Sequence, residues 1–279
     1  MTINFLKMHG LGNDFVILDG RKEDFPDKEK LSQKVADRHF GAGCDQVIFL
    51  SSTNKADIRM EIFNPDGSEA GMCGNAARCV GDIVLKEKQT GTITIETKFY
   101  ILSAVRAEQG QVTVDMGEPR LDWQQIPLAR EEDTRFVPIM LPTSSDVEDS
   151  ENYPVCVSMG NPHCVFFVGG KIESFPVSEI GPIIEAHEIF PQKTNVEFVH
   201  IKDRSTIRMR VWERGTGVTL ACGSGACGAA VASMRRSYVD RKITVEMDGG
   251  NLLIEWNESN NHVYMTGPVA YVFSGQFNE

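Results

Sequence analysis

The chain has 279 residues, of which 41% are hydrophobic, and a formal net charge of −11 at pH 7. This composition provides for a sizeable core and so excludes a disordered chain, while the negative charge disfavours nucleic acid as a partner. The longest apolar runs are far shorter than the ~20 residues of a membrane-spanning helix, and no signal peptide is visible. The seven cysteines do not form the dense framework of a disulfide-rich protein, which is typical of reduced thiols in the cytoplasm.

Helices and strands are predicted from the spacing of the apolar residues. Helices are expected over 27–40, 75–88 and 223–238, and the last is rich in Ala and Gly, which suits close packing inside a curved sheet. Strands are expected at 112–116, 136–141, 207–211, 243–247 and 270–274. The polar, acidic stretch 143–152 predicts a solvated loop.

The second half of the chain repeats the first. Residues 58–63 (IRMEIF) match 207–212 (IRMRVW) at an offset of 149, and the same offset carries 46–50 onto 195–199 and 73–77 onto 222–226. With one residue of slip, 12–15 meets 160–163. Four segments in order at a nearly constant offset indicate an ancestral duplication into two similar α/β domains.

The duplication predicts the domain organisation. The first domain is expected to comprise 1–120 and 267–279, because it lacks a strand before Ile3 that the C-terminal strand could supply. The second domain is expected over 121–266. The predicted fold class is mixed α/β (α+β), with two pseudo-symmetric domains and an active site in the cleft between them.

Cys73 and Cys222 occupy equivalent positions in the repeat, each followed by Gly at the start of a predicted helix. A helix N-terminus carries positive partial charge, so it should lower the pKa of a thiol and bind a substrate carboxylate. Two similar domains would place one thiol on each side of a substrate. One thiolate could then remove a Cα proton while the other thiol delivers a proton to the opposite face, which predicts two-base racemisation or epimerisation.

The remaining cysteines have a simpler interpretation. Free Cys is usually a small buried apolar residue, and this is expected of Cys44, Cys79, Cys156, Cys164 and Cys227. No metal site is predicted, because neither a Cys-x₂-Cys pair nor a His cluster is present.

Polar residues in the duplicated segments are candidate ligand contacts. Asn13, Asn64, Asn161 and Asn195 lie at turns or strand ends, where Asn can also serve the turn alone. Glu213 and Arg214 align with 64–65 in the first repeat. This position favours binding of a ligand's ammonium and carboxylate groups by the two side chains over a surface ion pair between them. His163 could tune the pKa of a thiol.

These residues belong to segments that together resemble the diaminopimelate epimerase family. The matching segments are 7–15 (KMHGLGNDF), 45–46 (DQ), 63–67 (FNPDG), 73–79 (CGNAARC), 160–163 (GNPH), 194–196 (TNV), 213–215 (ERG) and 221–226 (ACGSGA). They span nearly the whole chain in the family's order, and the combination is highly specific. Ala76 stands where the family commonly has Gly, and Phe273 aligns with a Tyr near the dimer contact of some members.

The resemblance implies a cofactor-independent enzyme that interconverts LL- and meso-2,6-diaminoheptanedioate in lysine and cell-wall precursor biosynthesis. It implies two domains, each a sheet curled round a central helix, and a cytoplasmic homodimer. Cys73 and Cys222 would be the acid/base pair, and His163 and Glu213 would modulate the pKa values of the cysteines. The substrate contacts would be Asn13, Gln46, Asn64, Gly74, Asn75, Asn161, Asn195, Glu213, Arg214, Gly223 and Ser224.

Three alternatives stay open at the level of sequence. A proline or hydroxyproline racemase could use the same two-thiol scaffold, but the Asn-rich grip with Glu213 and Arg214 suits a long substrate with a second charged end. A fold relative from phenazine biosynthesis would lack thiol chemistry, whereas both cysteines are present here. The third alternative is a non-catalytic module that binds amino acids or carries out thiol redox chemistry. A redox module would form a reversible Cys73–Cys222 disulfide bond during its reaction cycle.

Overall fold

The computed structural model describes residues 2–21, 23–142, 152–170 and 172–278. These residues form two compact units: unit 1 extends to Asp115 and resumes at Thr266, and unit 2 is Met116–Met265. All but one residue of the loop predicted over 143–152 lies outside the described residues.

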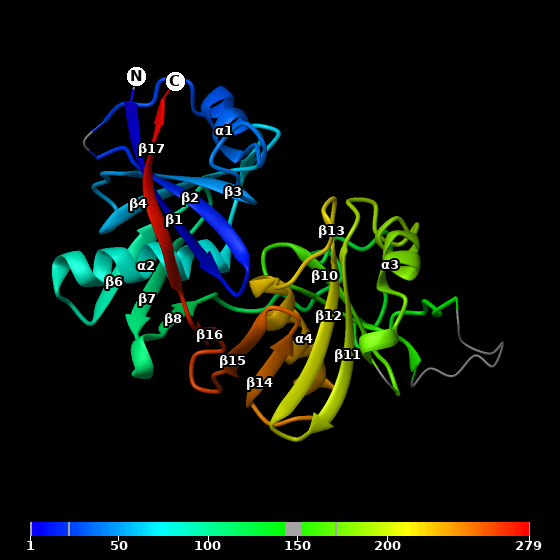
Figure 1. Cartoon of the computed structure of the whole chain (residues 1–279). Helices are drawn as coiled ribbons and strands as arrows, with labels where there is room; N and C mark the ends of the chain where they lie inside the picture. The colour runs from blue at the N-terminus through cyan, green and yellow to red at the C-terminus, as the bar shows by residue number, and fades with distance from the viewer. Residues whose placement is uncertain (1, 22, 143–151, 171, 279) are drawn as a thin grey trace. The chain divides into compact units, whose positions relative to one another are not determined.

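Unit 1 is a mixed sheet with two α-helices and one short 3-10 helix (Figure 1). Its strands are β1 (Thr2–Gly10), β2 (Asn13–Asp19), β3 (Gln46–Ser51), β4 (Ile58–Phe63), β5 (Glu69–Ala70), β6 (Thr92–Glu96), β7 (Ile101–Arg106), β8 (Val112–Asp115) and β17 (Ala270–Asn278). Its helices are α1 (Lys28–Ala36), α2 (Gly74–Lys88) and the short η1 (Glu108–Gly110). The C-terminal strand β17 runs antiparallel to β1, so both ends of the chain share one ladder, as Figure 1 shows.

Unit 2 has the same kinds of element. Its strands are β9 (Val155–Ser158), β10 (Pro162–Phe167), β11 (Asn195–Asp203), β12 (Thr206–Glu213), β13 (Gly217–Val218), β14 (Lys242–Met247), β15 (Gly250–Trp256) and β16 (Val263–Gly267), whose last two residues belong to unit 1. Its helices are α3 (Val177–Glu185), α4 (Gly223–Arg235) and the short η3 (Ile172–Ser174).

The strand pairing of the two units is duplicated. Parallel β2 and β3 place Phe15 opposite Gln46, and parallel β10 and β11 place His163 opposite Asn195. Likewise β4 runs parallel to β6 in unit 1, and β12 runs parallel to β14 in unit 2. Each unit therefore mixes parallel and antiparallel ladders in the same order, which confirms the predicted mixed fold with two similar halves.

The helices α2 and α4 are buried on most of their surface. In α2, 11 residues are buried, and α4 is buried from Gly225 through Met234. The helix α2 packs against β1, β6, β7 and β8, and α4 packs against β9, β10, β11 and β15. A helix that is buried on most of its surface must be surrounded by protein, so each of these helices is the central helix of its unit.

Two local predictions are wrong. Residues 136–141 form no strand, because Pro138 and Pro142 lack the N–H that a ladder needs; Val137 and Ile139 instead fill the core of unit 2. The first helix ends at Ala36 rather than at residue 40. There the Asp37 carboxylate accepts backbone N–H bonds from residues 39 and 40 at 2.7 and 2.8 Å, which stabilises a turn in competition with the helix.

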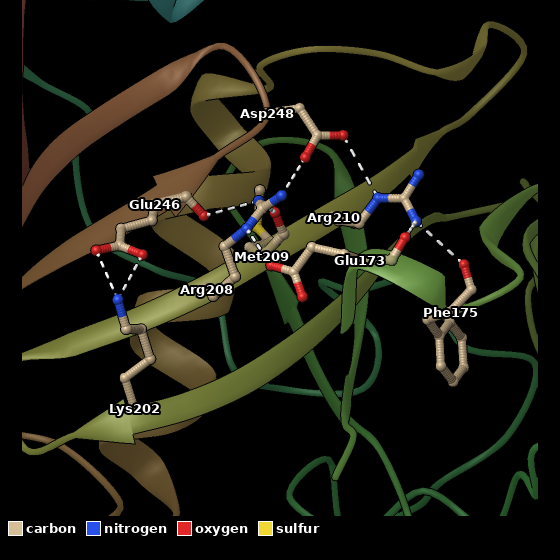
Figure 2. A network of polar contacts seen from close by, with 8 residues as sticks. All are labelled: Glu173, Phe175, Lys202, Arg208, Met209, Arg210, Glu246 and Asp248. Atoms are coloured by element: carbon tan, nitrogen blue, oxygen red, sulfur yellow. Dashed lines mark hydrogen bonds and ion pairs between the residues drawn. The ribbon is translucent and has the colours of Figure 1, made fainter. Parts of the chain in front are cut away.

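A network of charged side chains ties β12 to its neighbours in unit 2 (Figure 2). Arg208 pairs with Asp248 and donates to the backbone carbonyl of Glu246 at 3.2 Å. Arg210 pairs with the same Asp248 at 3.4 Å and donates to the carbonyl of Phe175 at 3.1 Å. With Lys202, Glu173 and Glu246 included, the network contains three basic and three acidic side chains, so its charges balance and we assign it a structural role.

Candidate active site

Cys73 is the N-cap residue of α2 and is half-buried. Its Sγ lies 3.7 Å from Asn13 Oδ1, and the same oxygen accepts a hydrogen bond of 3.1 Å from Asn75 Nδ2. Gly74 is the first residue of the helix. The structure therefore brings together four of the predicted site residues, Asn13, Cys73, Gly74 and Asn75, and Asn13 reaches the other three from the start of β2.

The turns that carry Asn13 and Asn161 share a glycine with a left-handed backbone directly before the Asn. Gly12 and Gly160, which precede them, have φ values of 88° and 97°. This left-handed region is readily accessible only to Gly, so the Gly-Asn pair in each repeat has a structural reason. The turn places each Asn at the start of a strand, β2 in unit 1 and one residue before β10 in unit 2.

Asp45 is a neighbour of the site that sequence reasoning did not assign to it. Its Oδ2 accepts hydrogen bonds from Asn13 Nδ2 at 2.9 Å and from the Asp14 backbone N–H at 3.0 Å. The sequence did contain an indication of this role, because Asp45 directly precedes the predicted contact Gln46 in one of the segments that match the family. Gln46 itself donates to Asn64 Oδ1 at 2.9 Å, so these two predicted contacts also lie together.

Asp14 anchors the same turn through ion pairs. It contacts Lys7 Nζ at 2.5 Å and Arg38 Nη2 at 2.8 Å. Burial raises the pKa of Asp14, but hydrogen bonds from Arg38 and Lys7 outweigh burial and hold this pKa at about 2, against an ordinary value of 3.8. A lowered pKa means that the ion pairs stabilise the fold fully above pH ~4, and that this stabilisation is lost as the pH falls through about 2.

Asp14→Asn is therefore expected to destabilise the protein by ~2 kcal/mol at pH 6 and by progressively less between pH 4 and pH 2. The measurement is the free energy of unfolding by denaturant titration, followed by circular dichroism at each pH. Asp24 is exposed, so Asp24→Asn serves as the control, and its free energy of unfolding should differ little from that of the parent protein at every pH. A difference between parent and Asp14→Asn that does not change with pH would contradict the assignment.

Cys222 is the N-cap residue of α4 and only 5% exposed. Its Sγ accepts a hydrogen bond from the Gly225 backbone N–H at 3.4 Å and lies 3.7 Å from Ser224 Oγ. Asn161 Nδ2 donates to the same Ser224 hydroxyl at 3.2 Å. Asn161, Cys222 and Ser224, with Gly223 as the first residue of the helix, therefore form a second cluster of predicted site residues.

The expectation that the helix N-terminus lowers the pKa of both thiols is wrong for Cys222. Burial raises the pKa of Cys222 well above its ordinary value, and the charges of Glu213 and Glu197 raise it further. The hydrogen bond from Gly225 lowers it by less. Desolvation of a thiolate outweighs the hydrogen bonds from Gly225 and Ser224 here, which favours the protonated form of Cys222.

His163 lies within unit 2 with no exposed surface. Its Nε2 is 3.1 Å from Asn161 Oδ1, and its Nδ1 is 2.7 Å from Glu197 Oε1. Sequence reasoning missed Glu197, which aligns with Ile48 in the first repeat and gave no sign of a polar role. The structure thus places His163 at the cluster around Cys222 and adds a buried carboxylate behind it.

The remaining predicted contacts lie at the ends of β11 and β12. Asn195 donates to the Pro162 carbonyl at 2.8 Å and accepts from the Arg214 backbone N–H at 2.9 Å. Glu213 accepts a hydrogen bond from the Thr219 hydroxyl. The exposed Arg214 side chain donates to the Gln192 carbonyl at 3.1 Å. Asn195 thus fixes the backbone that carries Glu213 and Arg214.

The other five cysteines are buried, as expected of packing residues: Cys44, Cys79, Cys156, Cys164 and Cys227. Burial raises the pKa of Cys44 to about 11 and that of Cys79 to about 12. Within the described ranges, no group of three or more His, Cys, Asp or Glu could hold a metal ion. No helix in the described part of the chain is long and apolar enough to cross a membrane.

Solved structures share this fold over the whole chain. A phenazine biosynthesis protein of the PhzF family from Bacillus anthracis matches with a TM-score of 0.73 at 18% identity, covering 100% of both chains. A probable proline racemase from Agrobacterium radiobacter K84 matches with a TM-score of 0.71 at 15% identity, covering 99% of this chain and 93% of that one. The fold is therefore that of the duplicated α/β proteins to which these two belong.

Sequence comparison is more specific. The profile of the diaminopimelate epimerase family matches residues 5–121 and 155–272. The diaminopimelate epimerase of Rhodospirillum centenum is 47% identical over 281 residues, covering 100% of this chain and 94% of its own length. The chain belongs to the diaminopimelate epimerase family.

Proposed function

We propose that the protein interconverts LL- and meso-2,6-diaminoheptanedioate by moving a proton at one Cα, without a cofactor. The observation that carries this proposal is the pair of N-cap cysteines, Cys73 on α2 and Cys222 on α4, at equivalent positions of the repeat in a member of the epimerase family. Inversion needs a base on one face of the carbon and an acid on the other, and two equivalent thiols supply both.

The state of Cys222 suggests how the roles are divided. Its raised pKa keeps the thiol protonated, which suits the proton donor. In the direction of the reaction in which Cys222 donates a proton, the half-buried Cys73 acts as the thiolate that removes the Cα proton. When the product forms, Cys73 is a thiol and Cys222 a thiolate, so the reverse reaction exchanges their roles. The N–H groups at the starts of α2 and α4 would stabilise the substrate carboxylate beside the reacting carbon.

The predicted substrate contacts fall into two sets in this proposal. Asn13, Gln46, Asn64, Gly74 and Asn75 belong to unit 1, and they would bind through amides and backbone N–H groups without adding charge. The set in unit 2 is Asn161, Asn195, Glu213, Arg214, Gly223 and Ser224. Glu213 would take an ammonium and Arg214 a carboxylate, while Glu213 and His163 modulate the pKa values of the thiols.

We further propose that the protein is a cytoplasmic homodimer whose domains are 1–120 with 267–279, and 121–266. The division into unit 1 and unit 2 supports these boundaries. Tyr271, Val272 and Phe273 in β17 are 44%, 52% and 49% exposed, and such neighbouring apolar side chains on a strand favour a protein contact.

The reaction is tested by incubating LL-2,6-diaminoheptanedioate with the enzyme in D₂O, without added cofactor. We expect meso product with deuterium at the inverted carbon, because the incoming proton comes from a thiol that exchanges with solvent. L-Proline and trans-4-hydroxy-L-proline serve as controls and should not exchange. Exchange with these imino acids instead would favour the racemase alternative, and absence of all exchange would contradict a two-thiol mechanism.

A further inference from the structure

Glu197 is a carboxylic acid buried in the interior of unit 2. It lies in β11 with no exposed surface, and burial raises its pKa, although His163 opposes this effect. Its neighbours Val196 and Phe198 point into the apolar core, so the alternation of the strand turns Glu197 to the opposite face, toward α4. Burial of a carboxyl group costs free energy unless the group is hydrogen-bonded. The proton transfers proposed for Cys73 and Cys222 do not involve Glu197.

Two glycines of α4 make room for Glu197 and its partner. A Cβ on Gly225 would lie 2.9 Å from Glu197 Oε1, and a Cβ on Gly228 would lie 3.0 Å from His163 Cγ. The same Cβ on Gly225 would be 3.2 Å from Cys222 Sγ, which puts Glu197 Oε1 and this sulfur no more than about 6 Å apart. The carboxyl group therefore lies directly beneath the first turn of the helix that Cys222 caps.

A continuous set of contacts links Glu197 to the thiol. Glu197 Oε1 is 2.7 Å from His163 Nδ1, and His163 Nε2 is 3.1 Å from Asn161 Oδ1. Asn161 Nδ2 then donates to Ser224 Oγ at 3.2 Å, and this hydroxyl lies 3.7 Å from Cys222 Sγ. With the Asn161 amide in this orientation, Oδ1 is the acceptor and His163 Nε2 carries the proton of the contact. A second proton is then shared between Nδ1 and Glu197, and the pair is neutral overall.

We propose that Glu197 is a positioning residue for the epimerase: by sharing a proton with His163 it holds the ring with Nε2–H directed at Asn161. This contact fixes the Asn161 amide so that its NH₂ meets Ser224 beside Cys222. The proton shared with His163 also offsets the negative charge of Glu197, which by itself raises the pKa of Cys222 and so opposes formation of the thiolate. The role rests on the proposed function, since it concerns the reaction at Cys222.

The first test compares two substitutions of similar size. Glu197→Leu removes the hydrogen bond to His163, and kcat should fall by about 10–100-fold, the range observed when the outer partner of a metal-binding histidine is removed. Glu197→Gln can donate to Nδ1 and keep Nε2 protonated, so it should restore kcat to within ~5-fold of the parent enzyme. KM should change little in both. The matched control is Asp82→Asn, which removes a buried carboxylate from α2 that pairs with Lys86, and it should retain the parent kcat.

The second test is the protonation of His163 in the parent enzyme, read from ¹⁵N–¹H NMR of histidine-labelled protein. We expect a protonated Nε2 and a far-downfield proton shared at Nδ1. A deprotonated Nε2, an unchanged kcat in a folded Glu197→Leu, or a Glu197→Gln as slow as the leucine variant would overturn the proposal. This NMR result does not depend on the substrate, so a parent enzyme without epimerase activity would count against the proposed function and not against the His163–Glu197 pair.

Discussion

Replacing Cys73 or Cys222 by Ala is expected to slow epimerisation by about 10²–10⁴-fold, because each change removes a positioned acid or base from one face of the carbon. Each variant should retain proton exchange at only one kind of stereocentre. The remaining thiol can still remove and return a proton on its own face. NMR in D₂O separates the two cases: one variant should exchange the L-centre of the LL substrate, and the other the D-centre of the meso compound.

Matched controls lie on the same two helices. Cys79→Ala on α2 and Cys227→Ala on α4 remove buried thiols that the mechanism does not use. Both should retain epimerisation rates close to that of the parent enzyme. If either Cys73→Ala or Cys222→Ala epimerised the substrate within tenfold of the parent rate, a mechanism with two cysteine bases would be wrong.

Replacing Phe198 by Ala is expected to lower the free energy of unfolding of unit 2 by about 3–5 kcal/mol. Phe198 is fully buried, its ring centroid lies 4.6 Å from that of Phe175 and 6.1 Å from that of Phe166, and it belongs to the apolar core cluster of unit 2. Deleting the ring removes these contacts and leaves a cavity in the core that supports β11. The loss arises on the face of the strand opposite Glu197.

The chain is well suited to this measurement. All three tryptophans, Trp123, Trp212 and Trp256, belong to unit 2, so tryptophan fluorescence during a denaturant titration reports on that unit. Phe40→Ala is the control, because the Phe40 side chain is 91% exposed and its removal should change stability by less than about 0.5 kcal/mol. A loss of under 1 kcal/mol for Phe198→Ala would show that this core is not tightly packed.

Much of the fold could be predicted from local patterns. The helix that follows Cys73 and the helix that follows Cys222 begin where the sequence placed them, within one residue, because Gly and Ala after each cysteine favour a slim buried helix. The strand over 270–274 is confirmed as part of β17. Residues 136–141 form no strand although their apolar residues resemble an alternating pattern, because Pro138 lacks the N–H that a ladder needs.

Sequence alone is enough to find the duplication, the two helix-capping cysteines and the Gly-Asn turns, since each of these is a local signal repeated at a fixed spacing. Tertiary packing, by contrast, was needed to bring Glu197 to His163, because 34 residues separate them and the contact depends on the register of β10 with β11. It also decided the protonation of Cys222, because desolvation depends on everything that packs around the sulfur. Local patterns indicate which backbone conformation a segment prefers. The pKa of a buried group, and the residues that it contacts, depend instead on how distant segments pack around it.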